Sequence, residues 1–167
     1  MPSTLDIILR LVTAMILSSI IGLEREYYRK PAGLRTMALV GLGSALFTVA
    51  SFRVRELFPS ALVDPTRIAA QIVTGIGFLG AGTIIRAQRS IVGLTTAATS
   101  FVVAAIGMAV GFGLYTEAIT ATVLVLGTLF GLSRVVDYVR AHSHAPSPWN
   151  DEKDEDAGKK ENNVSSL

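Results

Sequence analysis

Residues 68–85 read IAAQIVTGIGFLGAGTII, a run of eighteen residues without a charge. Such a run is long enough for a helix to cross the hydrocarbon core of a bilayer. It contains Gly75, Gly77, Gly80 and Gly82, although each glycine costs roughly 1 kcal/mol relative to alanine inside a helix. In membranes, small residues allow helix backbones to approach closely. We therefore expect a membrane helix whose glycines form a packing face within a helical bundle.

The rest of the chain has the same membrane character. Half of its residues are hydrophobic, only 17% are charged, and the charges cluster between long neutral runs. Only helices satisfy their backbone hydrogen bonds within such runs, which are too uniformly apolar for barrel strands. The composition predicts an all-α polytopic membrane protein, a bundle of five transmembrane helices. The expected helices cover residues of about 5–24, 36–53, 67–86, 94–114 and 117–137.

The C-terminal segment differs in composition from the spans. From Ala141 onward it holds two prolines, an acidic run at Asp151–Asp156, and serine, asparagine and lysine residues. We expect residues 1–140 to form the transmembrane domain and residues 141–167 to form a disordered acidic tail. An HxH pair in this segment would make only a weak metal site, so no metal site is expected. The chain has no cysteine, which excludes disulfides and thiolate ligands.

Basic residues next to the spans indicate the orientation. The loops after the first and third helices carry an excess of arginine and lysine, whereas the fourth loop has only Glu117. By the positive-inside rule, these two loops and the C-terminus lie in the cytoplasm and the N-terminus lies outside. The first helix lacks a basic leader and a small-residue cleavage pattern, so we expect it to be retained rather than removed as a signal peptide.

Candidate functional residues lie near the ends of the spans. Asp64 and Arg67 precede the glycine-rich helix, and Gln71 continues their face inward. These residues fit a simple helix start, and they also fit a charged outer mouth of the bundle. Glu24 is costly to desolvate, so we expect it to turn inward toward an arginine such as Arg35 or Arg86. The candidate set is Glu24, Arg25, Arg35, Asp64, Arg67, Gln71, Arg86, Thr95, Thr96 and Thr99.

Further polar and small residues have structural interpretations. Residues 93–100 (GLTTAATS) open the fourth helix, where Thr95 or Thr96 can cap it. Thr99 can bond a backbone carbonyl or reach across to a neighbouring helix. A helix N-terminus can also receive an anion. Gly107 and Gly111 have the GxxxG spacing of packed membrane helices. The GxGxxG at residues 75–80 has no strand before it and no acid about twenty residues on, so it does not indicate a nucleotide site.

One ion pair is predicted within the first span. Asp6 and Arg10 are four residues apart, a spacing that places them on one helix face near the outer surface. Both side chains can extend toward water from that position.

Three segments together resemble the MgtC/SapB family of bacterial inner-membrane proteins. They are GLEREYYRKPAGLRTMALVGLGSALF (22–47), DPTRIAAQIVTGIGFLGAGTIIR (64–86) and GLTTAATSFVVAAIGMAVGFGLY (93–115). The likeness spans about residues 5–137 and implies a multi-pass protein of the bacterial inner membrane. It also implies a role in survival at low magnesium and in restraint of the F-type ATP synthase. The long form of the family has a C-terminal ACT-like domain, and we expect this chain to be a short form without it.

Two classes of function follow from these observations. The first is a non-enzymatic regulatory or interaction protein, linked to magnesium limitation or envelope stress, with a membrane partner such as the F-type ATP synthase or a second copy of itself. The second is a transporter or channel for Mg²⁺ or an anion. The first is favoured because the inner parts of the spans contain no acid, whereas a magnesium pathway uses carboxylates or carbonyls. The sequence shows no nucleophile–base pair of the kind that would indicate an enzyme. No cofactor and no nucleic acid are expected.

Overall fold

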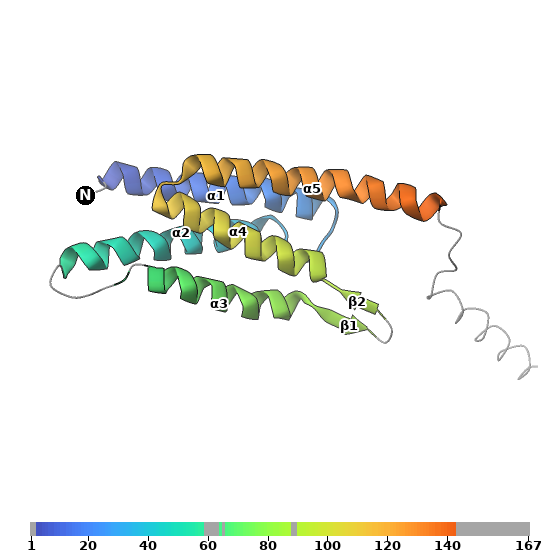
Figure 1. Cartoon of the computed structure of the whole chain (residues 1–167), viewed down its shortest axis with the longest axis horizontal. Coiled ribbons are helices and arrows are strands. Elements are labelled where there is room, and N and C mark those ends of the chain that lie inside the picture. The colour runs from blue at the N-terminus through green and yellow to red at the C-terminus, as the bar shows by residue number, and fades with distance from the viewer. Residues whose placement is uncertain (1–2, 59–63, 65, 88–89, 143–167) are drawn as a thin grey trace, which may run out of the picture. The chain divides into compact units, whose positions relative to one another are not determined.

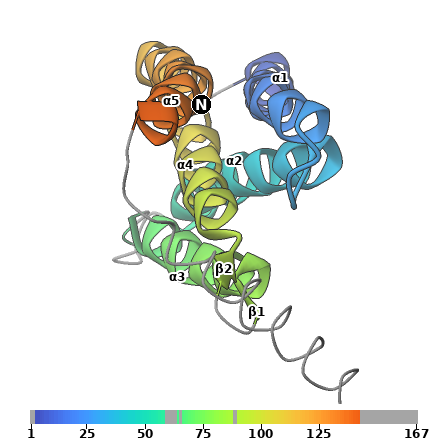
Figure 2. The same ribbon diagram turned by 90° about the vertical axis from the view of Figure 1, so that its right-hand side faces the viewer.

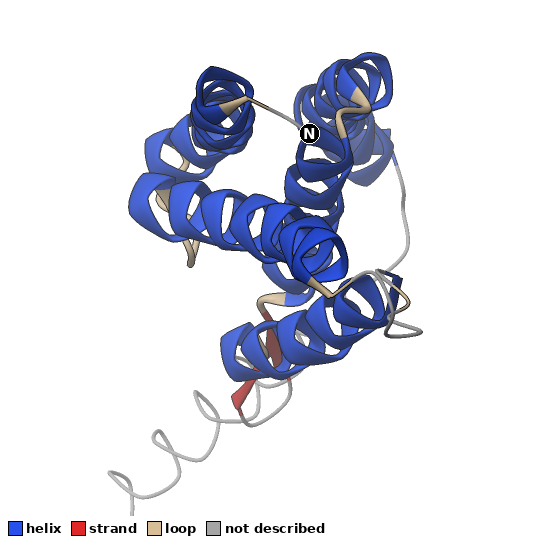
Figure 3. Ribbon diagram, turned by 90° about the vertical axis from the view of Figure 1, so that its left-hand side faces the viewer, coloured by secondary structure: helices blue, strands red, loops and turns tan. Residues whose placement is uncertain are grey.

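The computed structural model describes residues 3–58, 64, 66–87 and 90–142, and this part of the chain is almost entirely helical (Figure 3). Five helices and one short hairpin follow one another within it. Their bounds are α1 Thr4–Tyr27, α2 Leu34–Leu57, α3 Thr66–Thr83, β1 Ile85–Ala87, β2 Ser90–Val92, α4 Leu94–Phe112 and α5 Tyr115–His142. The chain divides into two compact units, residues 1–131 and 132–167, and α5 continues from the first into the second.

Four of the helices are long and apolar enough to cross a membrane. They are α1, α2, α4 and the Tyr115–Val136 part of α5. The chain is therefore an all-α polytopic membrane protein, as the sequence predicts. α3 is not among the four, since Arg67, Gln71 and several glycines lower the mean hydropathy of its eighteen residues. A fifth crossing, by α3, stays a prediction.

The third helix ends earlier than the sequence predicts. α3 stops at Thr83, and β1 then pairs with β2 as an antiparallel hairpin, with Ile85 opposite Val92. The prediction of a helix through residue 86 is wrong at this end, where β-branched residues favour a strand. Gly93 follows the hairpin with a φ of 97°, and a Cβ there would overlap the carbonyl oxygen of Thr83. Only glycine fits this turn.

α4 lies at the centre of the first unit. It packs against α1, α2 and α3, and α2 in turn packs against both α1 and α3 (Figures 1 and 2). The side chains at the centre are mostly small or β-branched, so the helix axes can lie close together. The buried core cluster is Ala14, Ile21, Met37, Ala45, Val103, Ile106, Val110 and Ala118.

The backbones of α2 and α4 touch where glycines face each other. A Cβ on Gly107 would overlap the carbonyl oxygen of Gly41, and one on Gly111 would lie 2.6 Å from Cβ of Thr48. Gly41 also faces the hydroxyl of Ser18 on α1, which is fully buried and makes no hydrogen bond within the described structure. Lipid tails are as apolar as the side chains, so this close packing is the main attraction between the helices.

Three of the four glycines of α3 do not serve this purpose among the described residues. A Cβ on Gly75, Gly77 or Gly82 would meet no atom within 4 Å, and one on Gly80 would make an ordinary 3.5 Å contact with Ala97. The prediction that these glycines bring helices together is therefore wrong for Gly75, Gly77 and Gly82 among the described residues, whereas Gly80 is buried where α3 packs against α4. The glycines of α2 and α4 have that role.

Replacing Gly107 with alanine is expected to lower the free energy of unfolding by about 1–3 kcal/mol, because the added methyl group forces α2 and α4 apart. Denaturant unfolding of the purified protein in detergent micelles measures the change. Gly82→Ala is the matched control, since its methyl group enters open space, and it is expected to leave the stability unchanged or higher. An equal loss in both variants would contradict the role of the α2–α4 contact.

Candidate functional site

Glu24 and Arg25 form a buried ion pair near the end of α1. Their exposed fractions are 5% and 4%. Nη2 of Arg25 donates to Oε1 of Glu24 at 2.7 Å, and Nε donates to Oε2, so the guanidinium holds both carboxylate oxygens. The predicted partners, Arg35 and Arg86, are both exposed instead. Glu24 turns inward to an arginine as expected, but this arginine is the neighbouring Arg25 rather than Arg35 or Arg86.

Glu26 stabilises the start of the next helix. Its Oε2 accepts the N–H of Leu34 at 3.0 Å, at a helix end whose N-cap, Gly33, has no side chain to do so. The carboxylate also lies at the positive end of the α2 dipole. The turn between the helices includes Arg29 and Ala32 with φ of 51° and 57°, a conformation that residues with a Cβ seldom adopt. Glu26 is not among the candidate residues predicted from the sequence, where its only signal is a glycine at the N-cap of the next helix.

Arg10 joins α1 to the end of α4. Its Nη2 lies 2.9 Å from Oδ2 of Asp6, which confirms the predicted i,i+4 pair. Its Nη1 also donates to the carbonyl oxygen of Gly111 at 2.8 Å. The last carbonyls of a helix lack partners within the helix, and a positive charge there is favourable.

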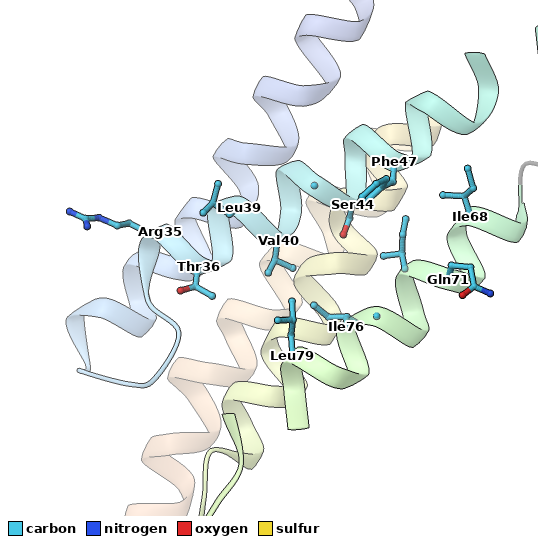
Figure 4. Close-up of a pocket in the computed structure, with 13 residues that line it drawn as sticks. Arg35, Thr36, Leu39, Val40, Ser44, Phe47, Ile68, Gln71, Ile76 and Leu79 are labelled. Atoms are coloured by element: carbon cyan, nitrogen blue, oxygen red, sulfur yellow. The ribbon is translucent and has the colours of Figure 1, made fainter. Parts of the chain in front are cut away.

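A groove with a volume of about 860 Å³ runs between α2 and α3 (Figure 4). Arg35 lies at one end with its guanidinium directed outward, and Ile68 and Gln71 lie at the opposite end. The wall between them is almost wholly apolar. The lining residues are Arg35, Thr36, Leu39, Val40, Gly43, Ser44, Phe47, Ile68, Gln71, Ile72, Gly75, Ile76 and Leu79.

The candidate residues from the sequence do not form one site. Arg35 and Gln71 line opposite ends of the groove, whereas Arg86 lies exposed on β1. Asp64 precedes α3, where its carbonyl oxygen accepts the N–H of Arg67 at 3.2 Å. The Arg67 side chain is exposed and does not line the groove.

The threonines of α4 stabilise their own helix. The N-cap is Gly93, and no side chain caps it, so the expected capping by Thr95 or Thr96 is wrong. Thr99 donates its hydroxyl to the carbonyl of Thr95 at 2.7 Å, which is one of the two roles expected for it. Thr96 and Thr99 are buried, whereas Thr95 is exposed. An anion at this helix end stays a prediction.

Several sequence predictions fall partly or wholly outside the described residues. Of the HxH pair only His142 is described, and its Nδ1 lies 2.9 Å from the carbonyl oxygen of Tyr138. His144, the predicted tail from residue 143 and Arg89 lie outside the described part of the chain. Among the residues that are described, no three histidine, aspartate or glutamate side chains gather where they could hold a metal ion.

Residues 11–138 match the model of the MgtC family, which covers both the Glu24–Arg25 pair and the groove. The chain belongs to the MgtC family. It is 48% identical over 129 residues to "Putative magnesium transporter YhiD" of Escherichia coli K12, covering 74% of this chain and 59% of that protein. It is 47% identical over 119 residues to "Protein MgtC" of Salmonella typhimurium LT2, covering 71% and 49% respectively.

A third relative is an uncharacterized protein of Haemophilus influenzae. It is 42% identical over 130 residues, which cover 75% of this chain and 55% of that protein. The matched part of the chain therefore spans only about half to three fifths of the length of these relatives. No solved structure matches. The resemblance predicted from the three sequence motifs is confirmed.

Breaking the buried pair is expected to destabilise this MgtC-family protein strongly. Glu24→Leu leaves Arg25 buried without its carboxylate and should cost about 3–5 kcal/mol of unfolding free energy. The double variant Glu24→Leu, Arg25→Met removes both charges and should recover most of that loss. Denaturant unfolding in detergent micelles measures the free energy of unfolding of the unaltered protein and of both variants. A double variant no more stable than Glu24→Leu would show that the pair is not an isolated, mutually compensating unit.

Proposed function

We propose that this chain is a non-enzymatic protein of the bacterial inner membrane that acts by contacting another membrane protein. The observation that carries the proposal is the packed interior of the first unit. Gly41 and Gly107 place the backbones of α2 and α4 in contact, and Ser18 fills the space beside them from α1. A bundle packed in this way supports recognition through its outer surfaces rather than conduction through its centre.

The charges close to the spans support the same proposal. The carboxylate of Glu24 is held by Arg25, that of Asp6 by Arg10, and that of Glu26 by a backbone N–H. A magnesium pathway uses oxygen ligands that are open to the ion and its waters. These three carboxylates are instead engaged in holding α1 and its neighbours in place.

An outer surface suited to a partner lies on the first half of α5. Ile119, Val123 and Leu124 are all at least half exposed there. A Cβ on Gly127 would meet no atom within 4 Å, so a partner helix could approach that point closely. The family resemblance supplies the partner that we propose, the F-type ATP synthase, with contact strengthened during magnesium limitation. We place the N-terminus outside and the C-terminus in the cytoplasm, as the basic loops indicate.

A second candidate function is magnesium transport. It is favoured by one specific observation, the 48% identity to an E. coli relative whose name describes it as a putative magnesium transporter. The matched region covers 59% of that relative, so the comparison does not extend to its remaining part.

Magnesium flux separates the two candidates. The purified protein, reconstituted into liposomes that contain a magnesium-sensitive dye, is expected to give no more Mg²⁺ uptake than empty liposomes. Uptake that is lost in Asp64→Ala or Arg67→Ala would overturn the proposal and establish the transport alternative.

Capture of the partner tests the proposed surface directly. Tagged protein from cells grown in low magnesium is expected to retain subunits of the F-type ATP synthase, detected by antibody. Gly127→Leu should abolish that capture, since the new side chain projects from α5 where no described residue of the chain contacts it. Gly82→Leu makes the same change in open space on α3 and should retain capture. Equal capture by both variants would reject the α5 surface, and no capture by the unaltered protein would reject this partner.

A further inference from the structure

We propose that the α2–α3 groove binds an anionic phospholipid, with the acyl part against the apolar wall and the phosphate at Arg35. This proposal goes beyond the proposed function and shares with it only the orientation that the basic loops indicate. It rests on the shape of the groove, its length along α2 and the position of a single arginine at its end.

The wall of the groove is open where two glycines face it. Gly43 on α2 and Gly75 on α3 both line the groove, and a Cβ on either would meet no atom within 4 Å. The side chains around them are apolar, including Leu39, Phe47 and Ile76. The missing side chains therefore leave an apolar space between the two helices that no described part of the chain fills.

The length of the groove matches one leaflet of a bilayer. Arg35 and Phe47 line it twelve residues apart on α2, which corresponds to roughly 18 Å along a helix. Half of a typical hydrocarbon core is about 15 Å. A lipid with its phosphate beside Arg35 would thus have its acyl chains beside the apolar wall down to Phe47.

The charge at the end of the groove is suited to a phosphate. The Arg35 side chain is exposed and points away from the apolar wall (Figure 4), and no described carboxylate pairs with it. The carboxylate of Glu26 accepts the N–H of Leu34, the residue next to Arg35. Arginine binds phosphate through two parallel hydrogen bonds. The basic loop places this end at the cytoplasmic leaflet, where anionic lipids attract basic residues.

The shape of the groove suits flexible chains. Its wall is almost wholly apolar and two of its lining residues are glycines. Acyl chains can fill such a space without moving α2 away from α3.

Native mass spectrometry of the purified protein tests the proposal, with phosphatidylglycerol and phosphatidylcholine offered in equal amounts. The unaltered protein is expected to retain phosphatidylglycerol preferentially. Arg35→Gln should reduce that preference by about tenfold, the effect of losing a charged hydrogen-bond partner. Arg86→Gln removes an exposed arginine that does not line the groove and should leave the preference unchanged.

A second pair of variants tests the place of binding. Gly75→Leu fills the groove and should lower retention of both lipids, whereas Gly77→Leu makes the same change two residues away, outside the groove, and should not. Gly43→Leu fills the groove from the opposite wall and should repeat the result of Gly75→Leu.

Three outcomes would overturn the proposal. The first is equal retention of the two lipids by the unaltered protein. The second is an equal effect of Gly75→Leu and Gly77→Leu on lipid retention. The third is a dimer that both Gly75→Leu and Gly43→Leu abolish, because the occupant of the groove would then be a second copy of the chain. Loss of ATP synthase capture by Gly127→Leu concerns α5, so the two proposals can fail separately.

Discussion

The contact between the backbones of Gly41 and Gly107 is the constraint on which the first unit depends. Helices in lipid gain little from burying apolar surface against one another, so they associate where their backbones can come close. This contact fixes α2 against α4, and Ser18 brings α1 to the same point. Ser18 makes no hydrogen bond within the described structure, but five other buried hydroxyls bond carbonyls of their own helix. These hydroxyls are those of Thr48, Ser51, Thr99, Ser100 and Thr122.

The charged residues near the spans fall into two groups with different consequences. Arg25 and Arg10 are engaged by carboxylates of α1, so they contribute to the shape of the molecule. Arg35 sits at the end of an open groove and pairs with no described carboxylate. A charge used within the fold is costly to remove, whereas a charge directed outward is available for recognition. This difference separates the structural arginines from the one that we connect with a ligand.

Local features of the sequence predicted much of this structure, and contacts between distant residues account for what it missed. Uncharged runs located the spans, and the four-residue spacing of Asp6 and Arg10 predicted their ion pair. The glycines were harder, since Gly75 and Gly107 lie in similar apolar surroundings in the sequence, yet only Gly107 meets another backbone. The site was predicted less well than the fold, because the groove depends on how α2 lies against α3, which no local pattern encodes.

The hydrogen bond from Arg10 to Gly111 links α1 to α4 across 101 residues of sequence. Asp6 is made before Arg10, so the ion pair within α1 can form as soon as that helix does. The carbonyl of Gly111 is synthesised only when most of the membrane domain has already been made. Arg10 therefore has its full set of partners only after α4 has inserted beside α1. This bond therefore requires that two helices made far apart in time lie side by side.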